Sequence, residues 1–135
     1  MAFEPIQLAD FAAEKIREFV LVHTDEIFYG FAIDASLLCF NSIEKFEAVL
    51  AYCKRTWPEK YGDPARIADL KMNTGDWGYQ GFASFDDHPG WDEELYSEHY
   101  EIGFEDYRSP LLEKTEYALA MEAVLAELKK RCVFD

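Results

Sequence analysis

The chain has 135 residues, half of them hydrophobic and 16% aromatic, and carries a formal net charge of −14. This length suits one domain, and the hydrophobic content excludes a disordered chain, which lacks apolar residues. The negative charge argues against nucleic acid and anionic membranes as direct partners, because both attract basic surfaces.

Two further features bear on the compartment. No segment reaches the ~18 apolar residues that a membrane-spanning helix needs, and the N-terminal sequence MAFEPIQLAD lacks the basic flank of a secretory signal. The cysteines Cys39, Cys53 and Cys132 show no metal-ligand spacing, and the last two fall on apolar stripes of predicted helices. We therefore expect a cytoplasmic protein with reduced, buried thiols and no metal or other cofactor.

The first predicted element is an amphipathic helix over residues 5–23, which Pro5 suits as its first turn. Its apolar stripe consists of Leu8, Phe11, Ala12, Ile16, Phe19 and Val20. Two apolar runs follow, Ile27–Ile33 and Leu37–Phe40, with turn residues between them. They predict a β-hairpin, and the longer run, apolar throughout, is expected to be a central strand.

A second helix is predicted over residues 42–56. Asn41 is expected to cap it and Glu44 to complete a capping box, and the helix should end before Pro58. The segment 64–70 suits one or two further helical turns.

The last predicted helix covers residues 110–132, with Ser109 as its cap and Pro110 in the first helical position. Its apolar stripe consists of Leu111, Ala118, Met121, Leu125, Leu128 and Cys132. Together these elements predict an α+β fold, in which one domain over residues 1–135 holds a small, mainly antiparallel sheet packed by three principal helices.

The charge is segregated along the chain. Between Lys71 and Arg108 there is no Lys or Arg but there are ten carboxylates, while the rest of the chain has 17 acidic and 13 basic residues. The same interval holds nine aromatic residues and several glycines, which predict turns. Carboxylates crowded without cations repel one another, so stability alone does not favour them. Combined with Tyr and Trp, they are typical of a surface that binds a basic protein.

Catalytic motifs are absent from the sequence. It has no P-loop, dinucleotide fingerprint, serine-hydrolase elbow or zinc-protease motif. Asp86, Asp87 and His88, with the carboxylates after them, could offer oxygens to a divalent ion, but they lack the register of an EF-hand. Two alternatives stay open. One is a small metal-dependent hydrolase that uses Asp86 and His88, and the other is a homo-oligomeric adaptor that pairs through the near-heptad stripe of residues 110–132.

Two short motifs resemble a known family. The segment Phe28-Tyr29-Gly30-Phe31-Ala32-Ile33-Asp34 is similar to the early strand, and Asn73-Thr74-Gly75-Asp76-Trp77-Gly78-Tyr79 to the central Trp motif, of a bacterial family of uncharacterised small domains. Members of that family occur in polymorphic-toxin neighbourhoods, which implies a role as immunity proteins. The order of predicted elements over residues 8–130 also resembles that family.

We therefore expect a non-catalytic immunity protein, monomeric or dimeric, that neutralises a cognate basic toxin domain. A nuclease is the best candidate, because proteins that act on nucleic acid tend to be basic. The candidate partner-binding residues are Asp76, Trp77, Asp86, Asp87, Trp91, Asp92, Glu93, Glu94, Glu98 and Tyr100. The carboxylates would pair with Lys and Arg of the toxin, and exposed Trp91 and Tyr100 would anchor it, whereas Trp77 suits either an anchor or the core.

Overall fold

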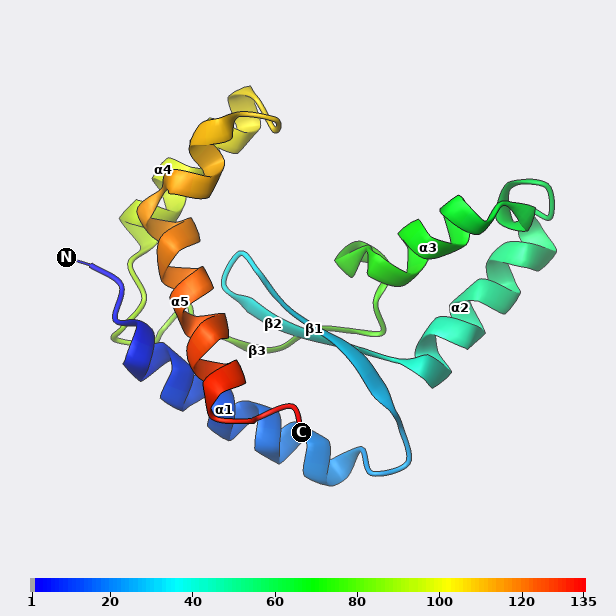
Figure 1. The fold of residues 1–135 in the computed structure, drawn as a ribbon, viewed down its shortest axis with the longest axis horizontal. Coiled ribbons are helices and arrows are strands. Elements are labelled where there is room, and N and C mark those ends of the chain that lie inside the picture. The colour runs from blue at the N-terminus through cyan, green and yellow to red at the C-terminus, as the bar shows by residue number, and fades with distance from the viewer. Residues whose placement is uncertain (1) are drawn as a thin grey trace. The chain divides into compact units, whose positions relative to one another are not determined.

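A computed structural model describes residues 2–135 (Figure 1). The elements are α1 (Pro5–Val22), β1 (Phe28–Asp34), β2 (Leu37–Ser42), α2 (Ile43–Thr56), η1 (Lys60–Gly62), α3 (Pro64–Met72), η2 (Thr74–Asp76), β3 (Tyr79–Ser84), α4 (Glu93–Glu105), η3 (Pro110–Lys114) and α5 (Glu116–Lys130), where η marks a short 3-10 turn. The predicted α+β class is confirmed. No helix within residues 2–135 combines the length and the apolar content needed to cross a bilayer.

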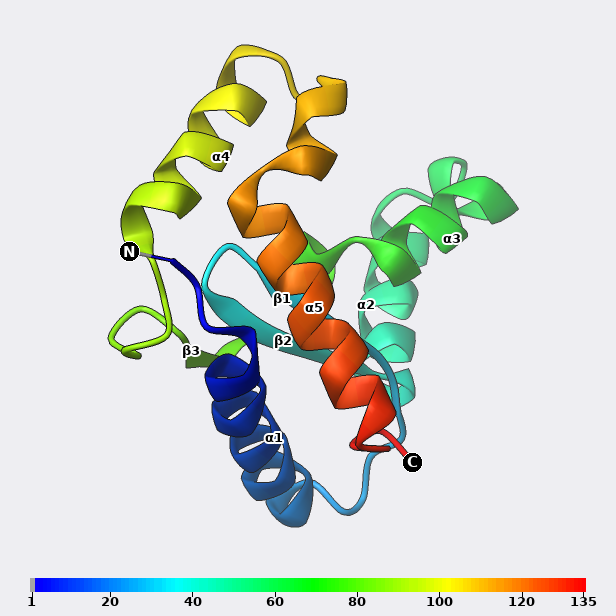
Figure 2. The same ribbon diagram turned by 60° about the vertical axis from the view of Figure 1, so that its left-hand side comes forward.

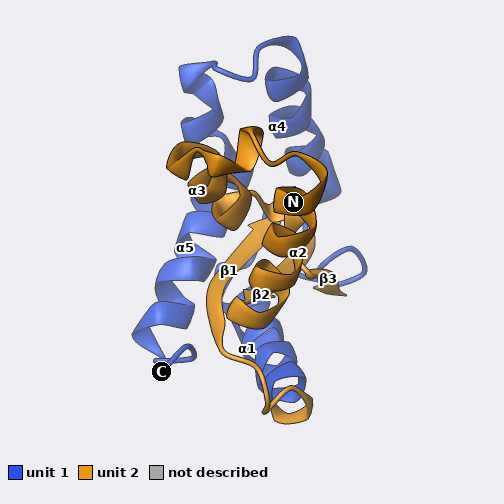
Figure 3. Cartoon of the chain, turned by 90° about the vertical axis from the view of Figure 1, so that its right-hand side faces the viewer, with its two compact units in different colours: residues 1–20, 84–135 blue, residues 21–83 orange. Residues whose placement is uncertain are grey.

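The chain forms two compact units, which Figure 3 shows in different colours. The sheet unit is Leu21–Ala83, and the helical unit is made of Met1–Val20 and Ser84–Asp135.

The sheet unit is built on a three-stranded sheet in the order β1-β2-β3, with β1 and β2 antiparallel. The predicted hairpin is confirmed: Asp34 pairs with Leu37, and Ala35 turns the chain with a φ of 55°. The expectation that Ile27–Ile33 forms the central strand is wrong, because β3 pairs with the other side of β2. β2 is accordingly buried along most of its length, whereas Ile27 precedes β1 and is exposed.

Helix α2 begins at Ile43, one residue later than predicted. Ser42, not Asn41, caps it by accepting a hydrogen bond from the Lys45 backbone N–H at 3.1 Å. Glu44 does not close a capping box, because its carboxylate accepts the Ile27 backbone N–H at 3.0 Å. Asn41 is still part of β2, and its side chain forms hydrogen bonds within the sheet unit instead. Figure 1 shows α2 leaving the end of β2 and α3 running back toward the sheet.

The two motifs that carry the family resemblance meet inside the sheet unit. Asn41 joins them: its amide donates to the Tyr29 hydroxyl at 2.7 Å, and its carbonyl oxygen accepts the Gly78 N–H at 2.9 Å. Tyr29 and Trp77 both donate to the Lys71 carbonyl oxygen, at 2.7 and 2.9 Å. The motifs therefore form one buried structural junction.

In the helical unit, the C-terminal helix is shorter than predicted. Ser109 caps only η3, and Thr115 caps α5, which starts at Glu116 (Figure 2). Leu111, expected on the buried stripe, is therefore exposed.

The C-terminal end of α5 corrects a second expectation. Cys132 is exposed, not buried, because it takes the left-handed conformation (φ 55°) that ends the helix. There its N–H bonds the Lys129 carbonyl, and the Val133 N–H bonds the Leu128 carbonyl, the pattern of a Schellman motif. The predicted stripe of α1 is confirmed at Leu8, Ala12 and Ile16, which are buried.

Gly30 tests the junction in the sheet unit. A Cβ added at this position would lie 2.8 Å from Cη2 of Trp77, closer than packed atoms tolerate. We expect Gly30→Ala to lower the free energy of unfolding by about 1–3 kcal/mol, the usual cost of overpacking. Denaturant unfolding measures this.

Gly62→Ala is the matched control, because an added Cβ there meets nothing within 4 Å. If Gly30→Ala costs no more than Gly62→Ala, the close approach of Trp77 to the strand is not a constraint on the fold.

Candidate interaction surface

Helix α4 lies between Lys71 and Arg108, where the glycines predicted turns. It runs for 13 residues, and Asp92 caps it by accepting the Leu95 N–H at 3.1 Å. Its partly buried side consists of Leu95, Tyr96, His99, Ile102 and Gly103, at the spacing of one helix face. That periodicity, together with the cap and two glutamates in the first turn, was the signal that could have predicted the helix.

A cluster of rings around Tyr117 of α5 holds this side of α4. The ring centroids of Tyr96 and His99 lie 5.0 and 4.6 Å from that of Tyr117, and the centroid of Trp91 lies 5.9 Å away. Phe3 closes the cluster from the N-terminal segment, 6.2 Å from Tyr117. Because several rings fix one side of the helix, the opposite side is held toward solvent.

Three of the ten predicted site residues are structural instead. Trp91 is 5% exposed, and its indole N–H donates to Glu93, so it is not an anchor for a partner. Trp77 is 6% exposed and belongs to the junction described above, so of its two predicted roles the core is correct. Asp92 is buried as the cap of α4. In each case the residue type suggested exposure, but the side chain is buried and contacts other parts of the protein.

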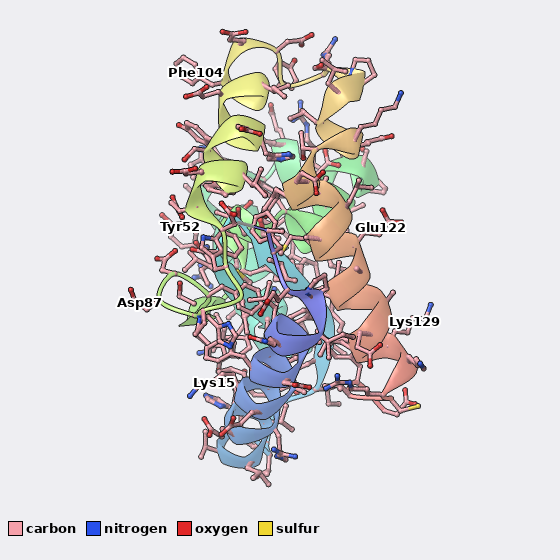
Figure 4. The ribbon with its side chains drawn as sticks, turned by 90° about the vertical axis from the view of Figure 1, so that its left-hand side faces the viewer. Lys15, Tyr52, Asp87, Phe104, Glu122 and Lys129 are labelled. Carbon is pink, nitrogen blue, oxygen red and sulfur yellow. The ribbon has the colours of Figure 1, made fainter. Side chains whose placement is uncertain are left out.

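The remaining candidates are exposed but belong to different parts of the chain. Asp76 lies in η2 of the sheet unit, where it accepts a hydrogen bond from the Asn73 amide at 2.8 Å. Asp86 and Asp87 lie in the loop after β3, and Figure 4 labels Asp87 on that loop. Four others lie on α4: Glu93, Glu94, Glu98 and Tyr100.

Helix α4 completes this set with residues that were not selected from the sequence. Glu94, Glu98, Glu101 and Glu105 follow one another at steps of four, three and four, so they share one line along the helix, here called the acidic stripe. Beside it lie Tyr100 and Phe104, the ring pair, with 57% and 80% of their surface exposed. Their rings stack with centroids 6.3 Å apart, and Figure 4 shows Phe104 extending away from the helix.

The acidic stripe is unfavourable for the helix that carries it. Each like-charged pair three or four residues apart destabilises a helix by about 0.2–0.5 kcal/mol. Glu101 and Glu105 also lie near the C-terminal end, where the helix dipole favours cations, and the last turn has no basic residue. Within residues 2–135 no stripe carboxylate forms an ion pair. Local stability therefore does not explain these four residues.

The net charge is concentrated in the same part of the chain. The helical unit contains 18 acidic and 7 basic residues, whereas the sheet unit contains 9 and 6. The helical unit is therefore the source of most of the negative field around the protein.

The other titratable clusters have structural partners. His88 accepts the Gly90 N–H at 2.9 Å through Nδ1, and its ring packs on that of Phe11. Across residues 2–135, no three His, Cys, Asp or Glu side chains are grouped so that they could hold a metal ion. Of the apolar stripe predicted for pairing through the last helix, Met121 and Leu128 are buried, whereas Leu111, Leu125 and Cys132 are exposed.

A carboxyl–phenol pair in the sheet unit has shifted pKa values. Burial and the hydrogen bond to Glu26 raise the pKa of Tyr79 to about 12. Burial alone would raise the pKa of Glu26, but hydrogen bonds from Tyr79 and Ser42 bring it below its ordinary value. Tyr79 and Ser42, which is fully buried, both donate hydrogen bonds to the Glu26 carboxylate. This pair therefore supports the fold and offers no reactive group.

Comparison of the chain with models of known protein families, with curated proteins and with solved structures gives no match. What the protein does is therefore inferred from its own surfaces, of which the outward side of α4 is the most unusual.

The cost of the acidic stripe can be measured. We expect Glu101→Lys to raise the free energy of unfolding by about 0.5–1 kcal/mol, because it replaces repulsion of Glu98 and Glu105 by attraction and suits the C-terminal dipole. Glu94→Lys changes the charge equally but lies in the first turn, where a cation is unfavourable, so it should not stabilise the protein. Equal effects of the two substitutions in denaturant unfolding would show that the stripe is not under strain.

His99 makes stability depend on pH. Burial lowers its pKa, and Nδ1 lies 2.7 Å from the hydroxyl of Thr115, the cap of α5. The unfolded chain therefore binds the proton more readily, so stability is complete above about pH 6.5 and falls as the pH drops below that value. We expect His99→Gln to flatten the curve of unfolding free energy between pH 7.5 and 5. Parallel curves for the two proteins would contradict this role.

Proposed function

We propose that this protein binds a positively charged protein through the outward side of α4 and does not act as a catalyst. The observation that carries the proposal is the acidic stripe beside the exposed ring pair, on a helix without a single cation. Such a surface combines the two properties that a docking site for a basic protein needs, which are long-range attraction and apolar area that can be desolvated.

Each part of the surface has a separate task in this proposal. The carboxylates accelerate encounter with a basic partner, because complementary charge raises the association rate. The ring pair then holds the partner, since Tyr and Phe offer large rigid areas at a small entropic cost. Asp86 and Asp87 add negative charge to the helical unit and are exposed. Trp91 acts indirectly, because it helps to fix the inner side of the helix.

More specifically, we propose that the protein is a cytoplasmic immunity protein that neutralises a basic toxin domain, with a nuclease as the best candidate. The resemblance of the two sequence motifs to a family from polymorphic-toxin neighbourhoods supports this role. A toxin that acts on nucleic acid needs a basic surface for its polyanionic substrate. An acidic helix with exposed rings could cover that surface and exclude the substrate.

The test uses the basic proteins encoded beside this gene. Each is produced in cells with and without this protein, and growth is measured together with the affinity of the purified pair. We expect one of them to be toxic alone and harmless with the intact protein. Glu98→Lys combined with Glu101→Lys should weaken binding at least tenfold, about 1.4 kcal/mol, and restore toxicity.

Glu122→Lys is the control, because Glu122 is exposed on α5 and away from the stripe (Figure 4). It changes the net charge as much as either single stripe substitution does, and it should leave binding within about twofold. If the control weakens binding as much as a single stripe substitution does, only net charge matters and α4 is not the docking site. If no neighbouring basic protein binds, the immunity role is wrong.

A further inference from the structure

The outward side of α4 carries two parallel lines of side chains with different chemistry. Successive residues of an α-helix turn by about 100°, so the acidic stripe and the line through Ser97, Tyr100 and Phe104 lie next to each other. Glu101 lies three residues before Phe104, the spacing at which two side chains are neighbours on a helix surface. A group bound between the two lines meets a ring face on one side and carboxylate oxygens on the other.

The rings are open to such a group. Tyr100 and Phe104 are more than half exposed, and the angle between their planes is 24°. The two rings are therefore nearly parallel and open to solvent. A flat cation can stack on an exposed ring, whereas a spherical one contacts it at a point.

The two natural cationic side chains differ in how they fit this site. A guanidinium is planar, weakly hydrated and has five donors, so it stacks on a ring and donates to a carboxylate at the same time. An ammonium group is a compact, strongly hydrated point charge, and it loses more hydration when it leaves water. A guanidinium between the ring pair and the acidic stripe can therefore stack on a ring and donate hydrogen bonds to a carboxylate at the same time.

Arginine makes both contacts within this protein, although lysines also lie over rings, as Lys71 does over Tyr29 at 5.1 Å. The Arg108 guanidinium lies over the Tyr107 ring, 5.1 Å from its centroid, just after α4 ends. Arg131 uses two of its nitrogens to reach two carboxylates at once, Glu127 through Nε at 2.9 Å and Asp10 through Nη1 at 2.7 Å. Glu127 is, like Glu101, a glutamate on a helix.

We infer that the outward side of α4 selects arginine over lysine in its partner, with guanidinium groups stacked on the ring pair and hydrogen-bonded to the acidic stripe. This inference rests on the proposed binding of a basic protein and adds the side chain that is recognised. A partner that docks through lysines would be attracted by the same field but would gain little from Tyr100 and Phe104.

The experiment compares two labelled peptides, hexa-arginine and hexa-lysine, by fluorescence anisotropy at physiological salt. We expect the arginine peptide to bind the intact protein at least fivefold more tightly. The double variant Tyr100→Ala, Phe104→Ala should lose that preference while still binding both peptides weakly through the stripe. Both substituted residues are exposed, and circular dichroism verifies that the variant stays folded.

Tyr52→Ala is the matched control, because Tyr52 is an equally exposed ring on α2 of the sheet unit. It should leave the preference for arginine unchanged. Equal binding of both peptides, or a preference that survives the loss of Tyr100 and Phe104, overturns the arginine inference and leaves the proposed binding of a basic protein intact. Binding of neither peptide contradicts both.

Discussion

The packing of α4 against Tyr117 decides which residues of this helix face solvent. Tyr96, His99 and Trp91 surround the Tyr117 ring, and Phe85 stacks on Trp91 from the other side with centroids 5.8 Å apart. Together these ring contacts hold one side of α4 inward. The glutamates of the acidic stripe, on the opposite side of α4, therefore face outward.

The two sides of α4 have opposite effects on the stability of the helix. The inner side of α4 contributes ring packing, whereas the outer side contributes repulsion between carboxylates and an unfavourable charge at the C-terminal end. Proteins commonly accept local destabilisation where a surface is needed for binding. The ring cluster is therefore the structural condition that lets the helix tolerate its own charge.

In the sheet unit, the most distinctive residues have a structural role. Its conspicuous sequence motifs, which carry the resemblance to an immunity family, are used to build the protein. Gly30 and Trp77 meet at close range, and Asn41 links the two motifs by hydrogen bonds to Tyr29 and Gly78.

Sequence patterns predicted those parts of the fold that depend on local signals. Helices α1 and α2 and the β1–β2 hairpin follow from periodicity and turn residues, and their predicted limits are close to those observed. β3 and α4 were missed because the glycines and aromatic residues around them suggested turns, although α4 has a cap and a regular inner face. The exposure of Trp91 was also misjudged, since residue type alone does not tell which rings pack against a distant residue such as Tyr117.

The site was predictable in its charge but not in its geometry. The excess of carboxylates between Lys71 and Arg108 is visible in the sequence, and Glu94, Glu98 and Tyr100 were selected from it. Glu101, Phe104 and Glu105 join them only when the segment is known to be a helix with a defined outer side.

Hydrogen–deuterium exchange of the protein, alone and with the basic partner proposed for it, tests the proposed docking site most directly. We predict that binding slows exchange in peptides covering residues 93–107 and leaves those from the sheet unit unchanged. Slower exchange confined to Leu21–Ala83, with α4 unaffected, would contradict the role assigned to this helix.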